Sequence, residues 1–526
     1  MGKRRSETTS TDEARTHVRL RLLGRLALCC AVGAMTNCTG LSPRAPAGND
    51  ASIDKGADSG VEKDAGYDSG SDAGDGGAIE VDGGDAGVDS GDDAGVAEDA
   101  GADGGADGGF DAGPPPLWPI RDGKSASDQA TAVAVDWSGS VYVTGFTSGD
   151  LYSSSGGGTD YFIAKFDSTG NNIWAQQVAT AGDDKALAIA LDTVGNPYVA
   201  GFVASGSTDA FLTRHDPTNG GVTWTQKVST SAVDYGKAVA LDPLGNVYLA
   251  GETFGFISDG GGGASDIFLA RFESATGARA WALQYGSASN DYVGGMTVGV
   301  VPRLEDAGVG GVTAALYDIY VVGQTFTPGS LPGADSGGAA YIAQFDSDGG
   351  HDWTFQFGGS NDFARAVRTP PTPPTRYFIL FETSVGFGGI PLLGGRDVFL
   401  VEYDTDFAIQ NRIAVQSSAN DWASGLAVNG AYAYFTGTTY GVVAAGADAS
   451  AGSDIFIARF NYVNGTLDWV RQFGSSGGVG ANGIALSAAG DLGYVVGSFD
   501  GGLLGLEAAD ASVDYFVLRF LNDGGF

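Results

Sequence analysis

The chain repeats one sequence pattern along most of its length. Each copy begins with an Asp and small residues, passes through an Asp/Gly turn and a Val-Tyr-Val segment, and ends with a Phe-containing segment and a Trp. The clearest copies run from Asp128 to Trp174, from Asp184 to Trp224 and from Asp234 to Trp281. Such internal repetition is typical of solenoids, propellers and arrays, in which each unit buries its apolar faces against its neighbours. The repeat therefore constrains the fold more than any other feature.

Each copy predicts four short strands joined by turns. In the first copy, Ala130, Ala132 and Ala134 alternate with larger residues such as Val133 and Val135. Alternation with period two predicts a strand with two different faces, one of them built only from Ala and Gly. A face this small suits a strand close to a crowded central axis. The Asp/Gly turns that follow are typical of hairpins, so each unit is expected to form a four-stranded antiparallel sheet.

Further copies start at Asp291, Asp362, Asp421 and Val479, which gives seven units in all. In the fifth unit the Trp is lost, and Arg412 or Ile413 is expected at its place. The seventh unit ends after its third strand, near Phe520.

The missing fourth strand is predicted at the other end of the repeat region. Trp118 precedes Asp128 by ten residues, as Trp174 precedes Asp184. A segment near Trp118 would therefore complete the last sheet and close a ring, which removes exposed sheet edges. We predict an all-β, seven-bladed β-propeller of four-stranded antiparallel blades over residues 117–526.

The consensus resembles a known family of repeats. Asp-x-Ala-x-Ala-x-Ala-Val-Asp, Gly-Asn-Val-Tyr-Val-Thr-Gly and Asp-Ala-Phe-Leu-Ala-Lys-Phe are similar to the SBBP-type bacterial β-propeller repeat, from Trp118 to the C-terminus. Members are typically exported surface or extracellular proteins without an assigned activity. The resemblance implies fold and location and adds little about mechanism.

Residues 1–38 are interpreted as a signal peptide. A basic run precedes the apolar segment LALCCAVGAM, which is too short to span a membrane as a stable helix. The sequence AMTNC resembles a bacterial lipoprotein signal in which Cys38 becomes acylated, and simple cleavage near Ala34 is the alternative. We expect an exported protein of the cell envelope, anchored in the outer membrane as a lipoprotein, or an extracellular one.

Residues 39–116 are predicted to be a disordered acidic stalk. Between residues 51 and 113 there are eighteen Asp or Glu and two Lys, among Gly, Ala and Ser. Such a segment buries too little apolar area to offset chain entropy, and its charges repel one another. The whole chain carries a net charge of −35, which argues against nucleic acid and against adsorption to anionic lipid.

Catalytic motifs are not found in the sequence. The three cysteines lie at or before Cys38, and no HExxH or Walker-type loop occurs. The histidines share no motif, and His215 replaces a Phe of the third strand, which indicates a structural role. We therefore predict no catalytic residue, no enzyme activity and no cofactor, with Ca²⁺ as the one ion to consider.

One Asp at an equivalent position in six units forms the candidate site. If the ring closes, these residues come to one end of the central channel, where they would form an acidic rim for a ligand or a hard cation such as Ca²⁺. Alternatively, each Asp caps a local turn. The six residues are Asp128, Asp184, Asp234, Asp291, Asp362 and Asp421.

Aromatic residues follow four of these Asp residues. Tyr235, Tyr292, Phe363 and Trp422 either pack between blades or stack on a sugar or peptide. The Trp that ends most units is expected to pack between blades.

Together these features predict a monomeric cell-surface propeller that acts by binding or adhesion. Its partner would be a surface protein, a peptide or a glycan, and it would contact the membrane only through the lipid anchor. One alternative is an extracellular carbohydrate-active or other hydrolytic enzyme that uses the rim carboxylates, and another is a structural component of an envelope assembly. The interaction surface is expected where the repeat is interrupted, at 301–315, at 369–375 and at the unequal Gly-rich loops.

Overall fold

A computed structural model describes most of the chain from Trp118 onward. The described residues are 118–124, 126–257, 264–301, 316–334, 337–370, 376–445, 452–474, 477–504, 506–507 and 512–526. They all belong to the second of the two units into which the chain divides, Gly105–Phe526. The predicted signal peptide with Cys38, and the predicted stalk, lie outside the described residues. Within the described part of the chain, no helix is long and apolar enough to cross a membrane.

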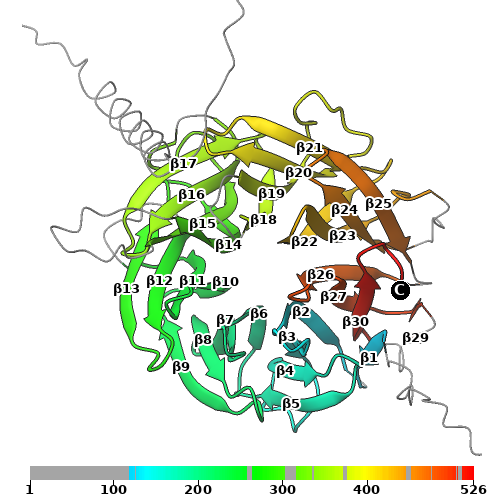
Figure 1. The fold of residues 1–526 in the computed structure, drawn as a ribbon. Coiled ribbons are helices and arrows are strands. Elements are labelled where there is room, and N and C mark those ends of the chain that lie inside the picture. The colour runs from blue at the N-terminus through cyan, green and yellow to red at the C-terminus, as the bar shows by residue number, and fades with distance from the viewer. Residues whose placement is uncertain are drawn as a thin grey trace, which may run out of the picture. The chain divides into compact units, whose positions relative to one another are not determined.

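Seven four-stranded antiparallel sheets stand around a central axis as the blades of a propeller, as the repeat predicted (Figure 1). The first three blades are β2 (Asp128–Val135), β3 (Val141–Thr147), β4 (Asp160–Phe166) and β5 (Asn172–Val178); β6 (Asp184–Leu191), β7 (Pro197–Ser205), β8 (Ser207–His215) and β9 (Val222–Val228); and β10 (Asp234–Leu241), β11 (Asn246–Thr253), β12 (Asp266–Glu273) and β13 (Arg279–Tyr285).

The next three blades follow in the same order. They are β14 (Asp291–Val301), β15 (Leu316–Thr325), β16 (Ala340–Asp346) and β17 (His351–Phe357); β18 (Phe363–Arg368), β19 (Arg376–Thr383), β20 (Asp397–Asp404) and β21 (Ile409–Val415); and β22 (Asp421–Asn429), β23 (Tyr432–Thr439), β24 (Asp454–Asn461) and β25 (Thr466–Phe473).

The seventh blade joins the two ends of the repeat region and closes the ring. It consists of β26 (Val479–Leu486), β27 (Leu492–Phe499), β30 (Asp514–Leu521) and the N-terminal β1 (Ile120–Asp122), while β28 (Gly502–Leu503) and β29 (Leu506–Glu507) pair with each other. In β1, Ile120 pairs with Val517 and Asp122 with Tyr515. The predicted closure by the segment after Trp118 is confirmed.

The antiparallel order gives the propeller two different faces. In each of the first six blades the innermost strand begins at or next to the repeat Asp, and the loops between second and third strands leave from that same end. We name this end the Asp face, and the opposite end, with the short turns, the turn face. Backbone bonds connect the blades at the Asp face, since Asp184 N–H donates to Thr159 O at 2.6 Å and Asp128 N–H donates to Val513 O at 2.7 Å.

The inner strands depart from the predicted alternation. In all seven blades a β-bulge interrupts the pairing of the first two strands, between Ala130 and Ala132 in the first blade. Because the bulge inserts one residue, Ala130 shares a sheet side with Val133, and Ala132 lies on the other side. The prediction of a face built only from Ala and Gly was therefore wrong.

Three of the seven bulged residues link neighbouring blades through their side chains. Thr131 donates its hydroxyl to Ala186 O at 2.8 Å, and Ser424 donates to Ala481 O at 2.6 Å. At the ring closure, Asn482 Nδ2 donates to Ala130 O at 2.8 Å. Each of these bonds runs from one inner strand to the inner strand of the next blade.

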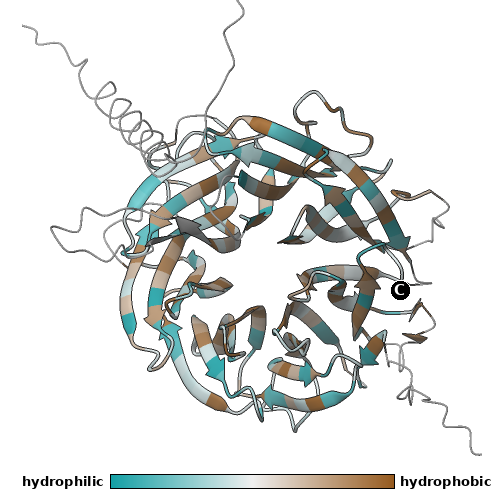
Figure 2. Ribbon diagram, viewed as in Figure 1, coloured by the Kyte–Doolittle hydropathy of each residue, from teal (hydrophilic) through white to brown (hydrophobic). Residues whose placement is uncertain are grey.

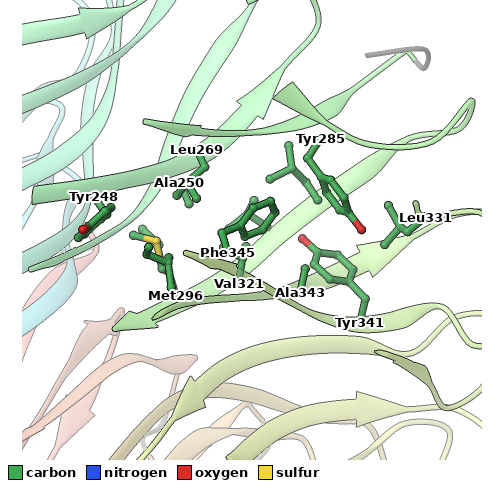
Figure 3. Close-up of a cluster of buried hydrophobic side chains, with 14 residues drawn as sticks. Tyr248, Ala250, Leu269, Tyr285, Met296, Val321, Leu331, Tyr341, Ala343 and Phe345 are labelled. Carbon is green, nitrogen blue, oxygen red and sulfur yellow. The ribbon is translucent and has the colours of Figure 1, made fainter. Parts of the chain in front are cut away.

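The apolar core lies between the blades. Seven buried clusters occur, and each is built from two neighbouring sheets. Figure 3 shows the cluster between the third and fourth blades, in which Leu269 faces Phe345 and Val321. Hydrophobic segments recur in every sheet (Figure 2). Because a sheet in this ring buries its faces only against its neighbours, blade stability depends on ring closure.

The Trp at the start of the outer strand also connects neighbouring blades. Trp224 donates its indole N–H to Ser274 O at 3.0 Å, and Trp174 donates to Pro217 O at 3.1 Å. In the fifth blade the register places Asn411, rather than Arg412 or Ile413, at the Trp position, opposite Glu402. Asn411 Nδ2 donates to the Glu402 carboxylate at 2.6 Å, so a polar pair replaces the aromatic contact there.

Candidate functional site

All six predicted Asp residues lie at the Asp face, and their side chains are fully buried. The six are Asp128, Asp184, Asp234, Asp291, Asp362 and Asp421. Each carboxylate accepts a backbone N–H from the preceding loop, for example from Lys124 at 2.9 Å, Thr230 at 2.6 Å and Ser417 at 2.6 Å. These contacts hold the connection between one blade and the next. They match the turn-capping interpretation of these residues.

Burial sets the acidity of this ring. Removal from water raises the pKa of all six carboxyls above the usual value, and hydrogen bonds from nearby Thr, Ser and backbone groups oppose the shift. For Asp421 the pKa rises to about 6, first through burial and further through the nearby Asp397 charge. The third-strand Asp of the preceding blade thus adds a second carboxylate at the same interface.

The ring was also considered as a cation site. Among the described residues, no group of three or more His, Cys, Asp or Glu side chains is arranged to hold a metal ion. Binding of Ca²⁺ or of an acidic-rim ligand stays a prediction, and the contacts of the six side chains are those of structural caps.

A second repeated pair, a Gln of the outer strand and an Asp of the third strand, holds loops of the Asp face and was missed in the sequence analysis. In the third blade, Gln284 Nε2 donates to the Asp266 carboxylate at 2.7 Å and to Gly255 O at 3.1 Å. Its Oε1 accepts the N–H of Ile257 at 2.9 Å. One glutamine side chain therefore fastens the loop after β11 to the outer half of its own sheet.

We name this arrangement, in which an outer-strand Gln binds both the third-strand Asp and the loop after the second strand, the Gln clamp. It also occurs in the first and sixth blades. Gln177 binds Asp160 and the loop after β3, and Gln472 binds Asp454 and the loop after β23. The signal was present in the sequence as Trp-x-x-Gln, at Trp174–Gln177, Trp281–Gln284 and Trp469–Gln472. The sequence alone does not show the role of this Gln, because its Asp partner lies on the neighbouring third strand.

The histidines have structural contacts. His215 is buried, with Nδ1 at 2.8 Å from Gly220 O, and burial lowers its pKa to about 4. His351 Nε2 lies 2.8 Å from Thr354 Oγ1, and its ring packs against Tyr285 with centroids 4.9 Å apart. Neither residue lies in a group that could bind a metal within the described part of the chain.

The four aromatics that follow the ring Asp residues are half-buried and pack against neighbours. Tyr292 meets Phe326 edge to face at 5.5 Å, and Tyr235 meets Phe202 at 5.0 Å. Trp422 lies under the Arg396 guanidinium at 4.8 Å. Neighbouring side chains thus hold these rings in fixed orientations, as the packing interpretation predicted.

Exposed apolar side chains occur at both ends of the ring, in the short turns and in the loops of the Asp face. Seven of them, between 44% and 81% exposed, come from the connections between second and third strands in blades three to six. Phe254, Phe326 and Tyr440 occupy one repeat position, directly after the second strand. We name this set the apolar crescent: Phe254, Phe256, Phe326, Val385, Leu393, Tyr440 and Val442.

Cations near the crescent are engaged by carboxylates. Arg365 Nε binds the buried Glu382 at 2.8 Å, and Arg396 binds the same carboxylate at 2.9 Å. Lys237 lies 3.8 Å from Glu252. These ion pairs leave the crescent without an unpaired positive charge from those three residues.

Acidic side chains are exposed on the remaining part of the Asp face. Asp150, Asp183 and Asp500 lie in or beside the loops of the first, second and seventh blades. Among the described residues of the Asp face, the exposed Asp residues therefore lie on blades seven, one and two, and the exposed large apolar residues lie on blades three to six, apart from Leu504 on blade seven.

Comparisons with known proteins support the repeat and the fold. Residues 223–255 match the SBBP β-propeller repeat, as the sequence resemblance predicted. A comparison with curated protein sequences gave no match.

Several solved structures are similar to this chain at low identity and with TM-scores below 0.5. A quinohemoprotein alcohol dehydrogenase from Comamonas testosteroni is 12% identical over 76% of this chain and 75% of its own, with a TM-score of 0.38. The β-propeller domain of the Trilobed protease from Pyrococcus furiosus is 9% identical over 76% of this chain and 98% of its own, with a TM-score of 0.39. Raptor from Chaetomium thermophilum is 9% identical over 78% of this chain and 28% of its own, with a TM-score of 0.43.

Proposed function

We propose that this propeller, which carries the SBBP β-propeller repeat, is a binding scaffold at the cell surface and engages its partner through the Asp face. The observation that carries the proposal is the apolar crescent. Seven exposed apolar side chains come from one kind of loop in four consecutive blades. Large exposed apolar groups that come from neighbouring loops mark interaction surfaces. In the described part of the chain, the exposed apolar residues of the turn face are instead spread over the turns and the C-terminal end, on six of the seven blades.

The way the chain joins the ring supports this choice of face. Trp118 lies at the turn face, where its indole N–H donates to Ser168 O in the turn between β4 and β5 at 3.1 Å. A tether attached before Trp118 would therefore leave from the turn face. The proposal places the Asp face away from the attachment point, where a partner can reach it.

Export, the acidic stalk and the lipid anchor at Cys38 belong to the same proposal. A chain held by an N-terminal anchor and a long charged spacer would reach beyond the membrane surface. The partner would be a surface protein, a peptide or a glycan, and the propeller itself would be a monomer. The burial of the six ring carboxylates gives no support to the hydrolytic alternative, which needs them to reach a substrate.

Binding of the purified full chain to an envelope fraction tests the proposal. Immobilised wild type should bind saturably, and a triple variant of the crescent, Phe254→Ser, Phe326→Ser and Tyr440→Ser, should lose most of the signal. A control changes three apolar residues of the turn face, Trp137→Ser, Val194→Ser and Leu244→Ser, which are 69% to 76% exposed and so more exposed than the three crescent residues, at 44% to 58%. Equal loss in both triple variants, or none in the crescent variant, would refute the assignment of the Asp face.

A further inference from the structure

The side chains of the crescent favour a polypeptide partner over a glycan. This inference rests on the proposed function, in which the Asp face binds the partner. A glycan surface is built from flat aromatic rings with polar groups beside them, because sugar C–H groups stack on rings and hydroxyls need hydrogen bonds. The crescent instead combines Phe254, Phe326 and Tyr440 with the aliphatic Val385, Leu393 and Val442. Aliphatic groups add no stacking face for a sugar, but they do contact apolar side chains of a polypeptide.

The loops that carry the crescent are fastened before any partner arrives. Gln284 holds Gly255 and Ile257 on either side of Phe256, and Gln472 holds Gly441 and Val443 on either side of Val442. Groups that are already held lose less conformational freedom on binding, so more of the contact energy appears as affinity.

Three exposed Asp residues of the Asp face lie on the blades beside the crescent, and the cations of the same blades include Lys124, Lys185 and Lys227, of which Lys227 pairs with Asp209 at 3.2 Å. Asp150, Asp183 and Asp500 are exposed, whereas Lys237, Arg365 and Arg396 are paired with buried glutamates. Lys124 is exposed, and its ammonium donates to Asp150 O at 2.9 Å. The net charge of −35 adds a long-range field of the same sign, which attracts positive partners.

We infer that the Asp face binds a basic, amphipathic polypeptide segment. Its apolar side chains would contact the crescent on blades three to six, and its Lys or Arg side chains would lie over the acidic loops of blades seven, one and two. Anionic lipid fits this face poorly, because the same acidic loops would repel its headgroups.

Peptide binding to the full chain tests the inference. Three fluorescent peptides of about twelve residues each are sufficient to span several loops. The first joins Leu and Phe residues to a run of Lys, the second replaces Lys with Glu, and the third replaces Leu and Phe with Ser. Anisotropy should show tight binding of the first peptide only, and it should weaken as NaCl rises from about 50 mM to about 500 mM.

Paired variants locate the contacts. The crescent triple variant should weaken binding of the first peptide about tenfold or more, while the turn-face triple variant stays near wild type. Asp150→Asn, Asp183→Asn and Asp500→Asn together should weaken it at low salt. The matched control Asp348→Asn, Asp406→Asn and Asp523→Asn removes three exposed charges from turn-face loops and should have little effect. Because the predicted stalk is the same in every variant, its own attraction for Lys cancels in these comparisons.

The outcomes separate the inference from the function on which it rests. Equal binding of the Glu peptide, or equal effects of the Asp-face and turn-face variants, would overturn the basic-polypeptide assignment. If no peptide binds and envelope binding still depends on the crescent, the function stands and this ligand class is wrong. Crescent-dependent binding of phosphatidylglycerol vesicles or of a neutral glycan, with no binding of the first peptide, would likewise overturn it. Circular dichroism of each variant checks that the sheets remain folded.

Discussion

Replacing Gln284 by Leu should loosen one loop of the Asp face and leave the others intact. Leu has a similar size but cannot bond, so the N–H of Ile257 and the carbonyl of Gly255 lose their partner. Two neutral hydrogen bonds contribute roughly 1 kcal/mol each. The free energy needed to open the loop should therefore fall by about 2 kcal/mol. That difference corresponds to about 30-fold faster amide exchange in this segment.

The third bond of Gln284 predicts a further, global effect. Its Nε2 donates to the buried Asp266 carboxylate at 2.7 Å, and a hydrogen bond to a charged group contributes about 1.5 to 3 kcal/mol. The other oxygen of Asp266, Oδ1, is also buried and has no hydrogen-bond partner. Gln284→Leu should therefore leave a buried charge without compensation, and adding Asp266→Asn should recover part of the lost stability.

Hydrogen exchange followed by mass spectrometry measures both effects in one molecule. Exchange should accelerate at 254–257, while the loops held by Gln177 and Gln472 serve as internal controls and keep their wild-type rates. Unchanged exchange at Ile257 would refute the clamp. Equal acceleration in all three loops would show global unfolding instead, and would also contradict the reasoning.

Four further outcomes follow from other parts of the molecule. Trp224→Phe removes the indole N–H bond to Ser274 O and should lower the free energy of unfolding by about 1 kcal/mol. Trp353→Phe changes a ring that packs edge-on against Phe407 and should lower it less. Urea unfolding monitored by circular dichroism compares the two variants. The raised pKa of Asp421, about 6 in the folded chain, means that the folded state binds more protons than the unfolded one between about pH 4 and about pH 6, so stability should fall as pH rises through that window. Asp421→Asn should reduce this slope in thermal melts taken across the window, and an unchanged slope would exclude Asp421 as its source. Addition of Ca²⁺ should leave the melting temperature unchanged if the ring Asp residues act only as caps, and a saturable rise that Asp421→Asn abolishes would establish the cation site. Cys38→Ala should release the chain from the membrane fraction, and unchanged retention would rule out the lipid anchor.

Much of the fold could be predicted because the same strand and turn pattern occurs in several copies along the sequence. Trp118 and Trp174 stand at the same distance before Asp128 and Asp184, and this spacing alone predicted the ring closure that β1 and β30 form. The turn residues and the Phe-containing strand recur often enough to define four strands in a unit. No single copy would have carried that prediction.

The β-bulge could not be predicted from the same pattern. It occupies positions as different as Thr131, Lys237, Arg365 and Asn482, so no residue type marks it. The regular spacing of Ala130, Ala132 and Ala134 suggests an unbroken strand, but the extra residue moves Ala132 to the opposite side. At Thr131 and Asn482 the bulged side chain bonds to the next blade, a contact that depends on the ring rather than on the strand.

The location of the candidate site was predicted only in part. The sequence identified the six Asp residues and the aromatics beside them, yet burial and capping appear only when neighbouring blades meet. The crescent is hidden for a related reason. Phe254, Phe326 and Tyr440 follow the second strand in three units, but a sequence cannot show which of its apolar residues remain uncovered.

Topology also separates the three interruptions that were expected to mark one interaction surface. Residues 302–315 and 371–375 lie outside the described residues; the strands that flank them, β14 and β15 in one case and β18 and β19 in the other, have their facing ends at the turn face. The unequal loops between second and third strands belong to the Asp face, and the seven crescent residues come from these loops. Under the proposed function, the loops between second and third strands mark the binding face, and the role of the two insertions stays a prediction. The stronger criterion is the combination found on blades three and six, where apolar groups stay exposed on loops that the Gln clamp holds in place.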